Sequence, residues 1–298
     1  GGAEKVCLAF ARALLEAGHE VTLVTIDKTD WHMLRGVFGD AFIMQFKEHF
    51  LFVRMPRMVN TTMRGFFMVL FYLINVFLVR LRGDFDLLVS TSGEFIDSFA
   101  DLVYINALPL RLMHLYPNVY VERGTQWRCY SKLHDIFLKI IAGTSDRSFL
   151  LTNSSFNREI IKRNLCRESL VLYPPVDVGK FKASAKNFER EGLVVTVSRF
   201  RPGKVLGVVP KIAELVRDSR FLIIGPSSEA SEGTLKELKE AMKRLNVEDR
   251  FELLIGEPQS KLLQTLGKAK VLLHTQPYEA FGIAVVEAMA AGCVPVVP

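Results

Sequence analysis

The chain has 298 residues, of which 49% are apolar and 23% charged. This length supports one large domain or two of ordinary size, and the composition argues against intrinsic disorder. The 4 cysteines form no Cys-x-x-Cys pair and the 6 histidines show no zinc-ligand spacing. We therefore predict no disulfide framework and no metal site, and we expect a reducing compartment, the cytoplasm.

The two ends of the chain are expected to be cut inside a fold. Gly1 and Gly2 stand directly before a helical pattern at 6–14, and such a glycine pair is typical of a turn that follows a strand. The last residues, CVPVVP, have the pattern of a buried strand with nothing after it. No signal-peptide pattern is visible before the first helix, so we expect no secretory leader.

The first half alternates between strand and helix patterns. Ser154 or Ser155 is a plausible N-cap for one of the helices. Strands are predicted at 20–26, 86–91, 102–105, 148–152 and 169–172, and helices at 131–143 and 154–163.

A proline pair, Pro174 and Pro175, interrupts this alternation and is followed by a polar stretch at 180–192. Two prolines neither continue a helix nor donate to a sheet, so we predict a stiff connector between domains 1–175 and 176–298.

The second half alternates more regularly. Its strands are predicted at 193–198, 221–224, 251–254, 271–274 and 294–297, and its helices at 205–217, 233–245, 260–268 and 282–291. Strand–helix alternation with short connections indicates parallel sheets covered by helices on both faces. The expected fold class is α/β, with two Rossmann-like domains facing a cleft.

A basic stretch in the first half contains an apolar helix. Between Lys47 and Arg82, six basic residues face one acidic residue, Glu48. The helix at 66–79 is too short to span a membrane. It is either a buried core helix or a helix that lies at a membrane surface beside Arg64 and Arg80.

Common nucleotide and hydrolase motifs are absent from the sequence. It contains no G-x-G-x-x-G after a predicted strand, no P-loop and no G-x-S-x-G. These absences disfavour a dehydrogenase, a P-loop ATPase and an α/β-hydrolase. The basic residues also form no nucleic-acid-binding motif.

Two segments of the second half form a candidate anion site. Arg199 and Lys204 follow the strand at 193–198, and ligands of open α/β sheets bind at the carboxyl ends of strands. Glu279 and Gly282 lie where the last helix begins, so backbone N–H groups of Phe281, Gly282 and Ile283 would point toward an anion. Glu287 follows Glu279 by eight residues on a nearby face. Pairs of glutamates eight residues apart also occur on or beside the charged helix predicted at 233–245. The prediction for Glu279 and Glu287 therefore depends on the surrounding sequence and not on the spacing.

These segments resemble a known family. EAFGIAVVEAMAAG is similar to the E-x7-E motif of the retaining GT-B glycosyltransferases of family 4, and SRFRPGK resembles their R-x4-K diphosphate loop. GGAEK resembles their glycine loop, and YPPVD resembles their interdomain connector. The resemblance implies a GT-B fold and transfer of a sugar, with mannose as the candidate, from a GDP- or UDP-sugar to a glycan or lipid-linked acceptor. A peripheral membrane contact fits such an acceptor.

The resemblance also implies roles for individual residues. Arg199 and Lys204 would neutralise the diphosphate together with the backbone of Phe281, Gly282 and Ile283. Glu279 would contact the sugar and Glu287 the ribose. Pro258 would lie near the base, and Gly1 and Gly2 would line the cleft. Family members need neither a metal nor a further cofactor.

One position departs from the family pattern. Asn106 stands where many members carry a histidine near the sugar, and an amide cannot titrate. His114 is the other candidate nearby. The alternatives are a non-catalytic nucleotide-sugar-binding scaffold, a GT-B sugar-nucleotide epimerase, or a phosphorylase.

Overall fold

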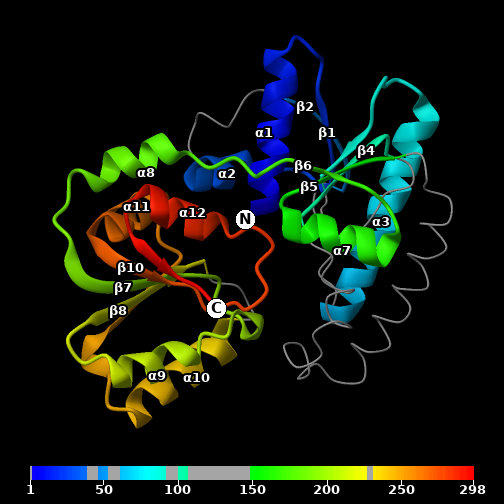
Figure 1. The fold of residues 1–298 in the computed structure, drawn as a ribbon. Helices are drawn as coiled ribbons and strands as arrows, with labels where there is room; N and C mark the ends of the chain where they lie inside the picture. Colours follow the sequence, from blue (N-terminus) through cyan, green and yellow to red (C-terminus); the bar gives the residue numbers. More distant parts are fainter. Residues whose placement is uncertain (1, 39–45, 53–60, 92–99, 107–147, 227–230) are drawn as a thin grey trace. The chain divides into compact units, whose positions relative to one another are not determined.

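The computed structural model describes residues 2–38, 46–52, 61–91, 100–106, 148–226 and 231–298. The chain divides into two compact units, Gly1–Pro175 and Val176–Pro298 (Figure 1). The helix predicted at 131–143 lies outside the described residues, as do Gly1 and His114.

Parallel strands organise the N-terminal unit. A two-stranded sheet has the order β1-β2, and a separate four-stranded sheet has the order β3-β4-β5-β6. The elements are α1 (Gly2–Glu16), β1 (Thr22–Asp27), α2 (Trp31–Phe38), β2 (Lys47–Phe52), α3 (Thr61–Arg82), β3 (Val89–Ser90), β4 (Leu102–Ile105), β5 (Phe149–Thr152), α7 (Ser155–Leu165) and β6 (Leu170–Val171).

The four-stranded sheet buries side chains on both faces with the period of two expected of strands. Val103 and Ile105 pack with Ile161 of α7 in one cluster. Tyr104, between them in the sequence, packs with Val6 of α1 in another. The Ser154 hydroxyl accepts the Asn157 N–H at 3.1 Å, which confirms the predicted N-cap of α7.

Helix α3 connects the two sheets of this unit. Asn75 Nδ2 donates to the Thr25 carbonyl of β1 at 2.8 Å, and the Tyr72 hydroxyl lies 2.8 Å from Ser90 Oγ of β3. The helix covers Thr61–Arg82, so the shorter prediction at 66–79 is wrong at both ends. The sequence pattern followed apolar residues only, whereas the helix continues through polar ones.

Charges within the chain neutralise part of the basic stretch. Lys47 pairs with Glu20 at 2.8 Å, and Arg80 binds Asp101 through both terminal nitrogens at 2.9 and 3.0 Å. Both carboxylates lie outside 47–82, which is why the local charge count overstated the free positive charge. No helix in the described part of the chain is long and apolar enough to cross a membrane.

The C-terminal unit is a five-stranded parallel sheet with the order β11-β10-β7-β8-β9. Its elements are α8 (Val178–Ala185), β7 (Glu191–Val197), the 3₁₀ turn η2 (Pro202–Lys204), α9 (Val208–Leu215), β8 (Arg220–Gly225), α10 (Ser231–Arg244), the 3₁₀ turn η3 (Glu248–Arg250), β9 (Phe251–Ile255), α11 (Gln259–Lys268), β10 (Ala269–Leu273), α12 (Ile283–Ala290) and β11 (Val294–Val296).

Helices cover both faces of this sheet, as predicted. Val195 and Leu272 point to a core cluster that includes residues of α8, α11 and α12. Phe221 and Ile223 point to the opposite cluster, which includes residues of α9 and α10. In Figure 1, α8, α11 and α12 accordingly lie on one side of the strands, and α9 and α10 lie on the other.

Two local predictions for this unit are wrong. Part of the stretch at 180–192, which we described as polar and in which we predicted no helix, lies in α8, which buries Phe181 and packs against α11 and α12. A single large apolar residue in so short a helix gives too weak a periodicity to detect. Helix α9 begins at Val208 instead of 205, because Val205 has a left-handed φ of 52° that separates η2 from the helix.

Candidate functional site

The candidate site lies at the carboxyl edge of the C-terminal sheet. Strands β10 and β7 are parallel neighbours, so the loops that follow them leave the sheet at the same edge. The loop after β7 leads through Arg199 to Lys204, and the loop after β10 leads from His274 to Gly282. Ligands of open α/β sheets bind at such an edge.

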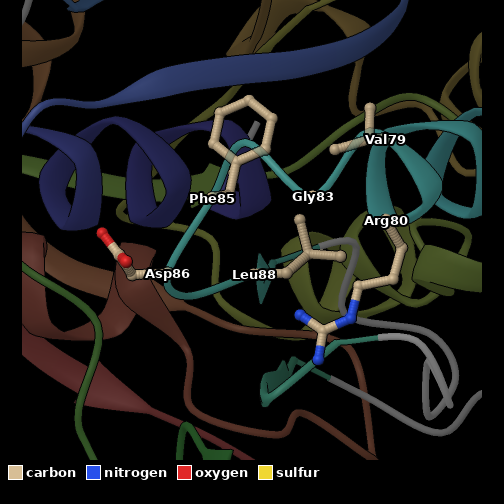
Figure 2. A pocket seen from close by; sticks show the side chains of 6 residues that line it. All are labelled: Val79, Arg80, Gly83, Phe85, Asp86 and Leu88. Atoms are coloured by element: carbon tan, nitrogen blue, oxygen red, sulfur yellow. The ribbon is translucent and has the colours of Figure 1, made fainter.

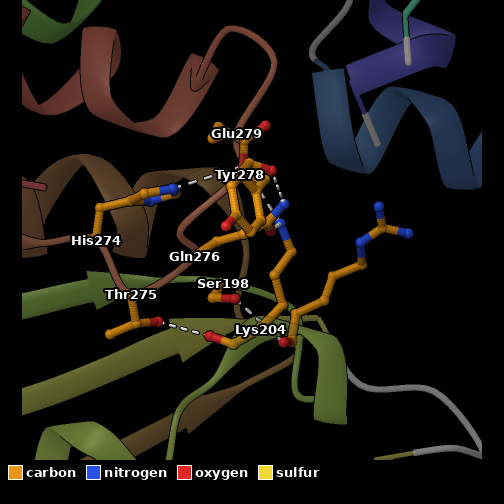
Figure 3. Close-up of polar contacts among 8 residues, drawn as sticks. Ser198, Lys204, His274, Thr275, Gln276, Tyr278 and Glu279 are labelled. Atoms are coloured by element: carbon orange, nitrogen blue, oxygen red, sulfur yellow. Dashed lines mark hydrogen bonds and ion pairs between the residues drawn. The ribbon is translucent and has the colours of Figure 1, made fainter. Parts of the chain in front are cut away.

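Lys204 joins the two loops (Figure 3). Its Nζ donates to Gln276 Oε1 and lies 3.4 Å from Glu279 Oε2. The Thr275 hydroxyl donates to the Lys204 carbonyl at 2.6 Å, and Gln276 Nε2 donates to the Tyr278 carbonyl at 2.7 Å. Lys204 and Glu279, which are 75 residues apart in the sequence, therefore lie in direct contact.

The environment of Lys204 makes its positive charge costly. The side chain is only 16% exposed, and burial lowers the pKa of Lys204. Glu279 opposes this effect, while Arg201 and Arg199 lower the pKa further. The Lys204 ammonium is thus repelled by two other cationic side chains, and an anion bound here would relieve that repulsion.

The turn into α12 has a conformation that favours glycine. Gly282 is the N-cap of α12, with φ 81° and ψ 60°. A Cβ at this position would lie 3.2 Å from Val285 Cγ2 and 3.4 Å from Glu279 Cγ. The helix begins at Ile283, one residue later than predicted. The partial positive charge of its N-terminus lies beside Glu279 and hence near Lys204.

The other predicted residues of this unit occupy different positions. Arg199 is exposed, and Phe281 and Ile283 flank the N-cap of α12. Glu287 is buried within α12, with 9% of its surface exposed. Pro258 is the exposed N-cap of α11 after β9, the edge strand two positions from β7.

Two predicted residues lie in the N-terminal unit. Gly2 is the exposed first residue of α1. Asn106 follows β4, and its carbonyl accepts from Asn153 Nδ2 and from Asn157 Nδ2, each at 2.7 Å. Its own Nδ2 is buried without a hydrogen-bond partner among the described residues.

The sequence prediction missed three residues of the site, His274, Thr275 and Gln276. All three stand between the end of β10 and Glu279. Ligands bind beyond the carboxyl ends of strands, and these residues follow β10 just as Arg199 follows β7. Their position after a predicted strand is therefore the signal that identifies them.

A shallow hollow of about 250 Å³ lies at the end of α3 in the N-terminal unit (Figure 2). None of the predicted site residues lines it. Arg80 is already paired with Asp101, which ties the end of α3 to the residue before β4. We interpret this hollow as a feature of the helix end. Its lining residues are Val79, Arg80, Gly83, Phe85, Asp86 and Leu88.

No group of three or more His, Cys, Asp or Glu side chains suited to a metal ion occurs within the described residues.

Residues 177–297 match the family described as "Glycosyl transferases group 1". The match spans almost the whole C-terminal unit, including Lys204, Glu279 and Gly282. The C-terminal unit is therefore similar to this family over nearly its whole length. The resemblance noted in EAFGIAVVEAMAAG and SRFRPGK is thereby confirmed.

Curated relatives share sequence with about half of the chain. The Dictyostelium discoideum protein named GDP-Man:Man(3)GlcNAc(2)-PP-Dol alpha-1,2-mannosyltransferase is 30% identical over 196 residues, covering 58% of this chain and 39% of the relative. The Mus musculus protein of the same name is 31% identical over 137 residues, covering 42% and 28%. The chain thus spans about two fifths, or less, of the length of these relatives.

Solved structures match over nearly the full chain. WaaG, a glycosyltransferase involved in lipopolysaccharide biosynthesis, has a TM-score of 0.65 at 14% identity, covering 100% of this chain and 77% of that chain. Sucrose-phosphate synthase from Thermosynechococcus elongatus has a TM-score of 0.69 at 16% identity, covering 97% and 73%. At these identities the likeness concerns the fold, and the GT-B fold predicted from the sequence is confirmed.

Proposed function

We propose that the protein is a retaining glycosyltransferase that moves a sugar, with mannose as the candidate, from a nucleotide-diphosphate sugar to a lipid-linked acceptor. The observation that carries this proposal is the contact between Lys204 and Glu279 beside the glycine-capped N-terminus of α12. The match of residues 177–297 to the glycosyltransferase group 1 family supports it.

The proposed chemistry is charge stabilisation at the leaving group. When the bond between the sugar and the diphosphate breaks, negative charge grows on the diphosphate oxygens. Lys204 and the N-terminus of α12 would stabilise that charge, and the exposed Arg199 would add a second cation. Glu279 would accept hydrogen bonds from sugar hydroxyls and so orient the transferred group.

The donor and acceptor are proposed from the relatives. The printed names of the Dictyostelium and Mus proteins specify GDP-Man and a dolichol-linked acceptor. HepE of Anabaena, whose structure has a TM-score of 0.64 and 15% identity, was solved in complex with UDP and glucose. GDP- and UDP-sugars are therefore the donors to test first.

The membrane-side part of the proposal rests on α3. Four of its apolar side chains are exposed and follow a helical spacing of three, four and seven residues, which places them on one face: Ile74, Phe77, Leu78 and Leu81. Such a face suits an acceptor that is presented at a lipid surface.

The test combines donor binding with transfer. We expect GDP-mannose or UDP-glucose to raise the melting temperature of the wild-type protein. Lys204→Met should weaken donor binding by roughly ten- to a hundredfold, because a hydrogen bond to a charged group contributes about 1.5–3 kcal/mol. Lys211→Met, at an exposed position on α9, is the matched control and should bind normally. Wild-type donor affinity in Lys204→Met would contradict the site assignment.

A scaffold that binds the donor without turning it over is the second candidate. The observation that favours it is Asn106, an amide where many family members have a titratable histidine. Donor binding without transfer to any lipid-linked acceptor would support the scaffold. Conversion of the free nucleotide sugar into an isomer would support an epimerase.

A further inference from the structure

His274 is a mostly buried histidine whose position the donor site alone does not explain. It directly follows β10, its side chain is 11% exposed, and its backbone N–H donates to the Val296 carbonyl at 2.8 Å. Among the described residues, its Nε2 has no hydrogen-bond partner. A buried polar atom without a partner costs free energy and calls for an explanation.

The nearest acidic group is the Glu279 carboxylate. His274 Nε2 lies 3.6 Å from Glu279 Oε2, which is slightly too far for a hydrogen bond (Figure 3). The Lys204 ammonium lies 3.4 Å from that same oxygen atom. Two cationic or potentially cationic groups therefore compete for one carboxylate oxygen.

In the absence of a ligand, Lys204 is favoured over His274 as the positive partner of Glu279. Burial is the largest influence on His274 and lowers its pKa, Glu279 acts in the opposite direction, and Lys204 lowers the pKa further. The lowered pKa of His274 favours its neutral form, and the Lys204 ammonium is the closer of the two groups to Glu279 Oε2.

A diphosphate would change this balance. The Lys204 ammonium would be drawn to the phosphate oxygens, and Glu279 would be left as a partly buried carboxylate beside another anion. A new positive charge next to Glu279 would then be favoured, and His274 is the group in position to supply it.

We propose, building on the proposed donor site, that His274 takes up a proton from solvent when the donor diphosphate engages Lys204, and that the imidazolium then holds Glu279 Oε2 in place of Lys204. Glu279 Oε1 stays available for a sugar hydroxyl. His274 is thus a positioning residue that orients Glu279 and does not touch the reacting atoms.

The direction in which donor affinity changes with pH follows from this proton uptake. Donor binding raises the pKa of His274, so binding tightens as the pH falls through the pKa of the bound state. The slope reaches roughly tenfold in affinity per pH unit between the pKa values of the two states. Above both pKa values the imidazole is neutral in each state and this pH dependence disappears.

The experiment is calorimetric titration of the full chain with GDP-mannose and with UDP-glucose at about pH 7, in two buffers of different ionisation enthalpy. Each phosphate of an intact nucleotide sugar has one ester and one anhydride linkage, and its single acidic group stays ionised near neutral pH, so proton uptake reports on the protein. We expect the wild type to take up a measurable fraction of one proton. His274→Gln is expected to bind, because an amide at this position would be able to donate to Glu279 without a proton from solvent, but it should take up none. His19→Gln, at an exposed histidine, is the matched control and should behave as wild type.

Two results would overturn the inference while leaving the donor site intact: binding by the wild type without proton uptake, or unchanged uptake in His274→Gln. Failure of both nucleotide sugars to bind would instead overturn the donor site, and this inference with it.

Discussion

Lys204 and Gly282 show how single residues prepare the candidate site. Lys204 is held between Gln276 and Glu279 in a mostly buried environment, where burial lowers its pKa. Gly282 lets the chain turn into α12 with a φ of 81°, a conformation that other residues adopt only at a cost. Each feature depends on a single residue: the positive charge on Lys204, and the turn on the lack of a Cβ at Gly282.

We therefore expect Gly282→Ala to lower the free energy of unfolding by about 1–2 kcal/mol, because a left-handed alanine is strained and its Cβ would lie 3.2 Å from Val285 Cγ2. Donor binding should weaken as well. Gly233→Ala is the control: it lies within α10, no atom lies within 4 Å of its added Cβ, and it should stabilise by up to about 1 kcal/mol. Urea unfolding measures both changes, and equal stability of the two variants would contradict the assigned strain.

At the scale of elements, Arg190 fixes the ends of two helices. It donates from Nη1 to the Ala269 carbonyl at the C-cap of α11 and from Nη2 to the Ala291 carbonyl at the C-cap of α12. A guanidinium suits this place because carbonyl oxygens at helix C-termini lack partners within the helix. The N-terminus of α12 lies at the candidate site. The hydrogen bond from Arg190 at the opposite end of this helix therefore also helps to position the site.

Replacing Arg190 with Met should leave both carbonyls without this donor and reduce the free energy of unfolding by about 2–3 kcal/mol. Arg190→Lys, which has no planar fork, should recover only part of that loss. The control is Arg217→Met at an exposed position, expected within about 0.5 kcal/mol of wild type. Denaturant titration distinguishes these outcomes. An unchanged free energy of unfolding in Arg190→Met would mean that the two hydrogen bonds from Arg190 are unimportant for stability.

At the scale of the whole molecule, each unit has its own core, and the exposed apolar residues of α3 belong to the N-terminal one. Lys47 and Arg80 are paired with carboxylates of the chain, so apolar contact is expected to contribute more than charge to any attachment to lipid. Flotation with anionic vesicles should accordingly depend only weakly on salt.

The double variant Phe77→Gln and Leu81→Gln tests this attachment. It should reduce binding to vesicles by roughly thirtyfold, corresponding to about 2 kcal/mol for two partly exposed side chains. Leu215→Gln is the matched control, because Leu215 is 82% exposed but lies on α9 in the C-terminal unit. If the wild-type protein does not float, or if both variants float equally, the membrane-side part of the proposal is wrong.

The sequence by itself determined the strand–helix alternation of the C-terminal unit, because apolar periodicity is a local property, and it singled out Lys204 and Glu279 through short motifs. It missed α8, whose one buried Phe181 leaves almost no periodic pattern. Only the tertiary structure decided which groups meet. The pairing of β10 with β7 brings Lys204 against Glu279 and leaves His274 beside them, and strand order is a property of the packed sheet that no local pattern encodes.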